Sequence, residues 1–154
     1  MKAAVEAMRK FDADAEVQRG GADVLAWMAN SHKESKQKIA SEGGIEVFLK
    51  AVRGFPDNEK VLEWNLVALG NLAMNDDNQV KIAEKGGIEL AIEALKRHPG
   101  NEGVQKYGCY VLHWMINLKS AHPKIIKGKE QLEYAKSTYP NPVSYTHLTL
   151  PTKA

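Results

Sequence analysis

Cys109 and His113 are the two residues whose types and spacing come closest to a reactive pair. They stand at positions i and i+4 of one predicted helix, which places both side chains on the same face. Such a pair could provide two metal ligands, or act as a nucleophile and its base. Two ligands do not complete a zinc site, and no third group is placed to orient the base. We therefore expect a structural role for the pair, with no metal and no catalysis.

Three acidic segments, DADAE, PDNE and NDDN, contain the carboxylates that calcium prefers. They lack the loop glycine and the distal glutamate of an EF-hand, so we interpret them as helix caps. The glycine pairs are not followed by lysine, which excludes a Walker-type phosphate loop. His32, His98 and His122 fall near predicted loops, where we expect them to be solvated. No cofactor is predicted.

The composition is that of a soluble globular chain, with 44% hydrophobic and 26% charged residues. We expect neither a membrane span nor a secretory signal, because the sequence has no long apolar run and no basic-then-apolar leader. The single cysteine agrees with a reducing compartment, and we expect an intracellular protein, in the cytoplasm, the nucleus or both. The formal net charge of +2 is too small for a surface that follows phosphates, which disfavours nucleic acid as a partner.

The helices that must position these residues are encoded more than once. GGIEVFLKAVRGFPDNE begins at Gly43 and GGIELAIEALKRHPGNE begins at Gly86, a period of 43 residues that Pro56 and Pro99 also keep. A period in this range is typical of two- or three-helix solenoid repeats. Because each unit of a solenoid buries its apolar faces only against its neighbours, the same faces must recur along the chain.

Each unit is predicted to contain a short first helix and an amphipathic second one. The first helix, in KQKIASEGG or QVKIAEKGG, ends at a glycine pair because glycine tolerates the left-handed conformation that closes a helix. The second helix is predicted to start at Ile45 or Ile88 and to stop at Pro56 or Pro99. Its apolar positions lie on one helical face, and in the first full unit they are Ile45, Phe48, Val52 and Phe55.

A long third helix completes the unit. Asp14, Asn58 and Asn101 occupy one repeat position and are predicted to cap it. Its predicted inner stripe consists of Val61, Asn65, Ala68, Leu69 and Leu72 in one unit, and of Val104, Gly108, Val111, Leu112 and Met115 in the next. Small residues such as Gly108 and Ala68 would let neighbouring helices approach closely.

A short helix, the GGI junction, an amphipathic helix, a Pro/Asn break and the helix LVALGNLAMN together resemble the armadillo repeat family. The resemblance extends over residues 1–142 and implies an all-α, right-handed superhelical solenoid of three-helix repeats. HEAT repeats are the nearest alternative, but they usually pair two helices without this glycine-closed first one. The resemblance also places Cys109 where the family has a small buried residue.

The repeat alignment predicts two complete units, with partial units on both sides. Met1 aligns with Ile45, so we expect the chain to be a fragment that starts inside a unit. The segment VSYTHLTLPT fits no repeat, and its back-translation resembles a transposon-end adapter of sequencing libraries, so we expect it to lie outside the fold. The predicted divisions are complete repeats at 31–75 and 76–118, partial units at 1–30 and 119–142, and a tail at 143–154.

The resemblance implies that third helices line a concave surface that binds extended peptides or folded partners. Here that surface is predicted to carry an aromatic band, suited to anchoring apolar side chains or the stems of Lys and Arg. The family's groove asparagine occurs only at Asn71, where it would bond a partner backbone. The alternative is that the rings pack between units. The predicted binding residues are Trp27, Trp64, Asn71, Tyr107, Tyr110 and Trp114.

The resemblance favours a protein-interaction module, a scaffold or adaptor segment, over an enzyme. Two alternatives remain: a regulatory solenoid attached to an enzyme outside this sequence, and a nuclear-import-type cargo adaptor. A cargo adaptor should show successive third-helix asparagines, and this chain has one. The expected partner is a protein or an extended peptide, with no membrane and no small-molecule substrate.

Overall fold

The computed structural model describes residues 1–116, 118 and 122–138. Every regular element among these residues is a helix, which confirms the predicted all-α repeat solenoid. None of the described helices is long and apolar enough to cross a membrane. In chain order the helices are α1 (Lys2–Lys10), α2 (Ala15–Ser31), α3 (Lys33–Ser41), α4 (Gly44–Gly54), α5 (Glu59–Leu72), α6 (Asp76–Glu84), α7 (Gly87–Arg97), α8 (Glu102–Met115), α9 (His122–Lys127) and α10 (Lys129–Thr138).

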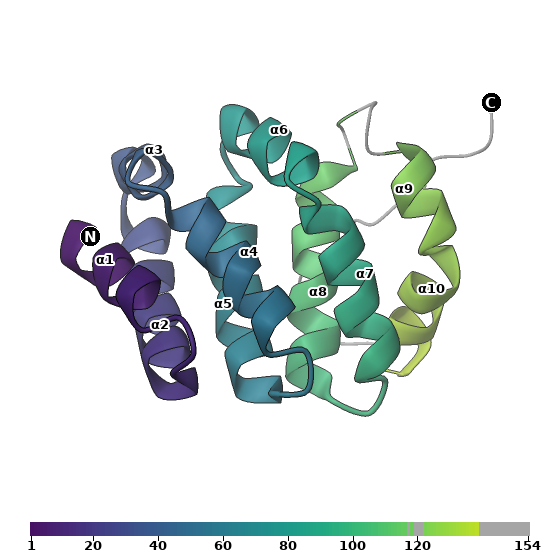
Figure 1. The fold of residues 1–154 in the computed structure, drawn as a ribbon. Coiled ribbons are helices and arrows are strands. Elements are labelled where there is room, and N and C mark those ends of the chain that lie inside the picture. Colours follow the sequence, from purple (N-terminus) through teal and green to yellow (C-terminus); the bar gives the residue numbers. More distant parts are fainter. Residues whose placement is uncertain (117, 119–121, 139–154) are drawn as a thin grey trace.

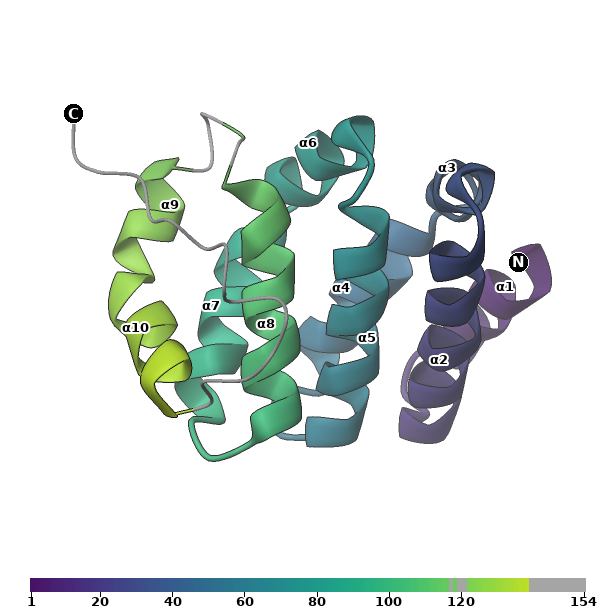
Figure 2. The same ribbon diagram turned by 180° about the vertical axis from the view of Figure 1, so that it is seen from behind.

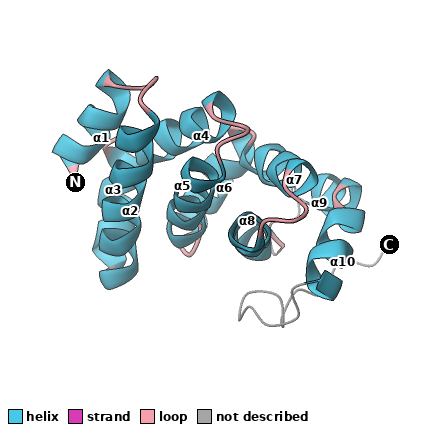
Figure 3. Ribbon diagram, turned by 90° about the horizontal axis from the view of Figure 1, so that it is seen from below, coloured by secondary structure: helices cyan, strands magenta, loops and turns pink. Residues whose placement is uncertain are grey.

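The longer helices form two rows. Helices α1, α4 and α7 lie in the row nearer the viewer in Figure 1, and α2, α5 and α8 lie in the row nearer the viewer in Figure 2. The short helices α3 and α6 lie at one end of the rows, at the top of both views. Figure 3 shows the two rows end-on, with α5 between α2 and α8. The third helices of successive units are therefore neighbours along one face.

The glycine pairs turn the chain between the first and second helices, and the two glycines do different things. Gly43 has φ 91° and Gly86 has φ 84°, in the left-handed region that L-residues with a side chain avoid. Gly44 has no such backbone, but a Cβ there would lie 2.4 Å from the Ile39 side chain. The first glycine thus permits the turn, and the second lets the two helices touch.

The helix ends agree with the predicted signals to within a residue or two. Helices α4 and α7 begin one residue before the predicted isoleucines, and they end two residues before the prolines. Phe55 therefore lies at the C-cap of α4, partly buried, instead of on its inner face. The predicted caps are confirmed: Asn58 accepts from the Val61 N–H, and Asp14 and Asn101 cap α2 and α8 in the same way.

The predicted inner stripes of the third helices are confirmed as core. All ten positions are buried, and seven of them join residues of the second helices in one continuous hydrophobic cluster that passes from unit to unit. Gly108 illustrates the close approach, because a Cβ there would lie 2.8 Å from the Leu95 side chain of α7. The core is thus shared between repeats and belongs to no single one.

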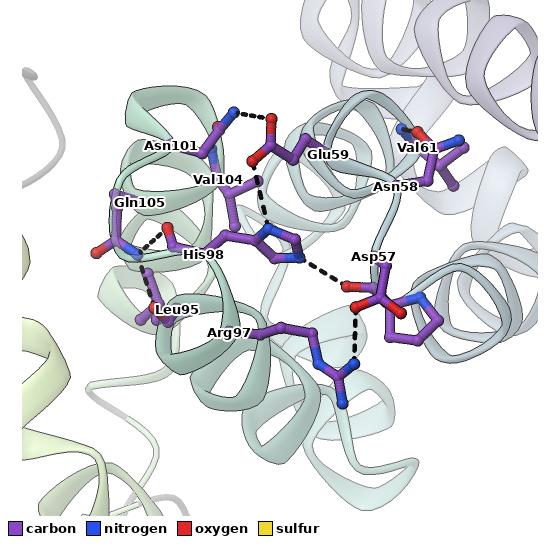
Figure 4. A network of polar contacts seen from close by, with 11 residues as sticks. Asp57, Asn58, Glu59, Val61, Leu95, Arg97, His98, Asn101, Val104 and Gln105 are labelled. Carbon is purple, nitrogen blue, oxygen red and sulfur yellow. Dashed lines mark hydrogen bonds and ion pairs between the residues drawn. The ribbon is translucent and has the colours of Figure 1, made fainter.

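The prediction that His98 is solvated is wrong, because its ring is largely buried between two repeats (Figure 4). Its side chain is 10% exposed, and the Nδ1 atom lies 3.4 Å from a Glu59 carboxylate oxygen. Its Nε2 atom donates to the Pro56 carbonyl oxygen at 2.7 Å. Beside it, Arg97 donates to the Asp57 carboxylate at 2.8 Å. The loops that follow α4 and α7 are therefore joined by polar contacts, whereas His32 is exposed as predicted.

A buried glutamine fixes the turn between the second and third helices in two of the units. Gln105 Nε2 donates to the carbonyl oxygens of Leu95 at 2.8 Å and His98 at 3.0 Å (Figure 4). Gln18, at the same repeat position, donates to the equivalent pair of carbonyls at the end of α1. These bonds satisfy carbonyls that a helix end leaves without partners. The predicted tail at 143–154, and part of the predicted unit at 119–142, lie outside the described residues.

Candidate partner-binding groove

A groove of about 300 Å³ opens across the row of third helices. Five of the six predicted binding residues line it, and only Trp114 does not. Three further residues complete the wall: Ala26 and Asn30 on α2, and Val67 on α5. Asn30 lies one turn after Trp27, so the i, i+3 spacing on α2 was the signal for it. We call this the aromatic groove, lined by Ala26, Trp27, Asn30, Trp64, Val67, Asn71, Tyr107 and Tyr110.

The rings of the aromatic groove differ in how firmly the protein holds them. Trp27 is 65% exposed, which is unusual for a side chain of this size. Trp64 and Tyr107 are partly buried against the hydrophobic core. The two rings therefore pack on the core and also line the groove, so packing does not remove them from the candidate surface. One exposed ring thus lies beside two rings that pack on the core.

Trp114 lies against its own helix instead of in the groove. Its ring meets Tyr110 edge-on, with centroids 6.3 Å apart, and meets His113 edge-on at 5.3 Å. It is partly buried and packs on the core. Trp114 therefore packs beside Tyr110, which itself lines the groove.

Asn71 is 7% exposed, and its amide is bonded within the protein. Its Nδ2 donates to the Ala26 carbonyl oxygen on α2 at 3.0 Å, and its Oδ1 accepts from the Tyr110 hydroxyl on α8 at 3.2 Å. One side chain therefore ties three successive third helices together. The bond to a partner backbone, which the family resemblance implies, would have to compete with both of these contacts.

Tyr110 reaches Asn71 because Gly70, the residue before Asn71, has no side chain. A Cβ at Gly70 would lie 2.3 Å from the Tyr110 ring, so the ring rests directly on the α5 backbone. Burial raises the pKa of the Tyr110 hydroxyl above its ordinary value, and the Trp114 side chain opposes this shift only in part. The hydroxyl thus keeps its proton and remains a donor to Asn71.

Charged side chains of α2, α5 and α8 do not line the aromatic groove. Of the described residues, those that line the groove carry no formal charge. On α2, Arg19 pairs with Glu16 at 3.1 Å, and on α5, Lys60 pairs with Glu63 at 2.9 Å. The Lys106 ammonium lies 5.2 Å from the centroid of the Tyr107 ring on α8. The arrangement offers a partner shape and apolar contact.

Cys109 is fully buried in the hydrophobic cluster, which fits the predicted structural role. Within the described residues, no three His, Cys, Asp or Glu side chains are grouped to hold a metal ion. The acidic segments contribute caps, since Asp14 caps α2 and Asn75 accepts from the Asn78 N–H at the start of α6.

Comparison with known protein families matches the family described as "LRRK2 ARM repeat" over residues 1–117. The chain belongs to this ARM repeat family. No curated protein and no solved structure gives a significant match. The match confirms the predicted armadillo resemblance over most of its predicted length.

The ARM repeat is a non-catalytic repeat fold, and its geometry explains where the groove lies. Helices α2, α5 and α8 are the third helices of successive ARM units, so equivalent positions stack along one face. Trp27, Asn71 and Trp114 share one repeat position. Their three different environments, exposed, bonded and packed, make the groove uneven along its length.

Proposed function

We propose that this ARM segment is a protein-interaction module, a scaffold or adaptor part of a larger protein, which binds a partner peptide or protein across α2, α5 and α8. The observation that carries the proposal is the exposed Trp27 in a groove whose Trp64 and Tyr107 rings pack against the core. Large aromatic side chains beside a preformed hollow are typical of binding hot spots. No catalytic step is part of this proposal.

The energy available at Trp27 is large enough to anchor a partner. A tryptophan can bury roughly 150–250 Å², so covering the 65% that is exposed removes roughly 100–160 Å² from water. At about 25 cal/mol per Å² this contributes roughly 2.5–4 kcal/mol before the entropy of association is subtracted. The partly buried rings have less surface left to remove from water, but they also lose little conformational entropy when a partner binds.

Of the two alternatives, the cargo-adaptor function loses support. That function relies on third-helix asparagines that bond a peptide backbone, whereas the asparagine of this chain already bonds Ala26 and Tyr110. A regulatory solenoid of an enzyme would use the same groove to bind another part of its own protein or a modulator. This function would therefore also depend on Trp27 for binding.

The test compares partner capture by the wild type with capture by Trp27→Ala and by Val24→Ala. Val24 is also exposed on α2 but does not line the aromatic groove, so it controls for general loss of apolar surface. Partners from a cell extract are quantified, and each is then purified and titrated against the three proteins. We expect Trp27→Ala to weaken binding at least about 10-fold and Val24→Ala to change it less than about 2-fold. Equal affinities for all three proteins would refute the groove as the binding surface.

A further inference from the structure

We infer that the aromatic groove selects a partner segment by a large uncharged side chain, aromatic or aliphatic, and not by Lys or Arg. This inference rests on the proposed function and names the chemistry of the ligand at the same site. It follows from three observations: the lining of the groove, the use of its one buried amide, and the pairing of the charges around it.

The lining offers apolar contact and few open hydrogen bonds. Four rings, Val67 and Ala26 make up most of the wall, and only two side chains in it are amides. Asn30 is exposed, whereas Asn71 is buried with both ends of its amide bonded. A volume of about 300 Å³ lies at the lower limit of small-molecule pockets, so it holds one or two side chains.

A basic side chain would meet a wall that contains no carboxylate to pair with it, so the cost of desolvating its charge would be offset only by the faces of the rings. The carboxylates of Glu16 and Glu63 are paired with a cation on their own helix. The Tyr107 ring, which could attract a cation, already has the Lys106 ammonium 5.2 Å from its centroid. A second cation beside Lys106 would also be repelled. An uncharged side chain meets none of these penalties.

Asp23 is an acidic side chain near the groove that would favour a basic ligand. It lies one turn before Trp27 on α2, is partly exposed, and has no ion pair within the described residues. It is not among the residues that line the groove. It therefore lies near the groove without forming the wall against which an inserted side chain would rest, and it provides the sharpest control for this inference.

The unusual position of Asn71 also explains why a side chain should dominate recognition. A free asparagine on each third helix would hold a peptide by its backbone and would leave side chains to set register. Here α2 and α8 carry tryptophan at that position, and α5 has its asparagine tied to both of its neighbours. With the backbone weakly held, affinity must come from what enters the groove.

The experiment uses a random 12-residue peptide library displayed on phage, selected on the full chain. Selected peptides are synthesised and titrated against the wild type, Trp27→Ala, Asp23→Asn and Asn30→Asp at low and high salt. All three substitutions are at exposed or partly exposed positions, and circular dichroism verifies that each variant folds. Asn30→Asp places a new carboxylate at the groove, so it would raise the affinity for a basic peptide and leave the affinity for an uncharged one almost unchanged.

We expect the selected peptides to share a Phe, Tyr, Trp, Leu, Ile or Met whose replacement by alanine weakens binding at least about 10-fold. Asp23→Asn, Asn30→Asp and added salt should each change affinity less than about 2-fold, because no charge is neutralised. Peptides that share Lys or Arg, weaken with salt and with Asp23→Asn, and tighten with Asn30→Asp would overturn this inference while the proposed function stands. If no selected peptide loses affinity to Trp27→Ala, the proposed function itself fails.

Discussion

Removal of the Asn71 amide is the perturbation that best tests how successive ARM units are joined. Asn71 bonds Ala26 in the preceding unit and Tyr110 in the following one. Asn71→Ala breaks both contacts, whereas Tyr110→Phe breaks only the second. A double-mutant cycle through these two substitutions isolates the energy of the Tyr110 to Asn71 bond.

The magnitudes follow from the two distances and the burial. A hydrogen bond contributes about 0.5–1.5 kcal/mol net, and a buried acceptor left unsatisfied raises the loss. Tyr110→Phe leaves the Asn71 oxygen without this donor in a side chain that is 7% exposed, so we expect a loss of about 1–2 kcal/mol. Asn71→Ala loses two bonds and some packing, and we expect about 2–3 kcal/mol. The double variant should lose about 1 kcal/mol less than the sum.

Urea unfolding followed by circular dichroism measures these free energies. Tyr107→Phe is the matched control, because it removes the same atom from the same helix and no hydrogen bond joins the Tyr107 hydroxyl to the described residues. We expect this control to stay within about 0.5 kcal/mol of the wild type. The reasoning is refuted if Tyr110→Phe behaves like Tyr107→Phe and the cycle gives a coupling energy of zero.

Three further predictions concern the turns, the caps and pH. Gly86→Ala should lower the unfolding free energy by about 1 kcal/mol because of its φ of 84°, whereas Gly54→Ala, at a helical position with open space around it, should be neutral in the same urea titration. Asn101→Ala should lower it by about 1–2 kcal/mol because its oxygen caps α8 and its Nδ2 donates to Glu59 at 2.8 Å, and Asn101→Asp should recover the cap part. The pKa of Tyr110 is raised in the folded state, so its stabilising contribution is complete below about pH 10 and is lost as the pH rises through the folded pKa. In thermal melts at alkaline pH, Tyr110→Phe should therefore lose less stability than the wild type does.

The repeat architecture could be predicted from the sequence because stacking imposes it locally. The 43-residue period, the inner stripe and the caps each depend on a few adjacent residues, and each is confirmed as a structural element. The glycine pairs were also informative, but for two separate reasons. Gly43 and Gly86 require the left-handed backbone, whereas Gly44 and Gly87 are small because an isoleucine of the first helix lies against them.

The polar contacts between units could not be predicted, because they depend on which residue of the neighbouring unit arrives opposite. His98 is in a loop by sequence, yet the Pro56 carbonyl and the Glu59 carboxylate of the preceding unit enclose its ring. Only the superposition of two turns of the solenoid brings these groups together.

At one repeat position of the candidate groove, the exposure of the side chains could not be predicted from the sequence either. Trp27, Asn71 and Trp114 are equivalent by alignment, and the resemblance assigned all three to one binding surface. Exposure at this position depends on the residues that flank it: Asn71 is buried because Tyr110 rests on Gly70 and reaches it, while Trp114 packs on Tyr110 and His113. Trp27 has no such partner ring among the described residues and stays 65% exposed. The periodic sequence therefore predicts which face of the solenoid the third helices form, and the aperiodic contacts between neighbouring units decide which side chains on that face are exposed.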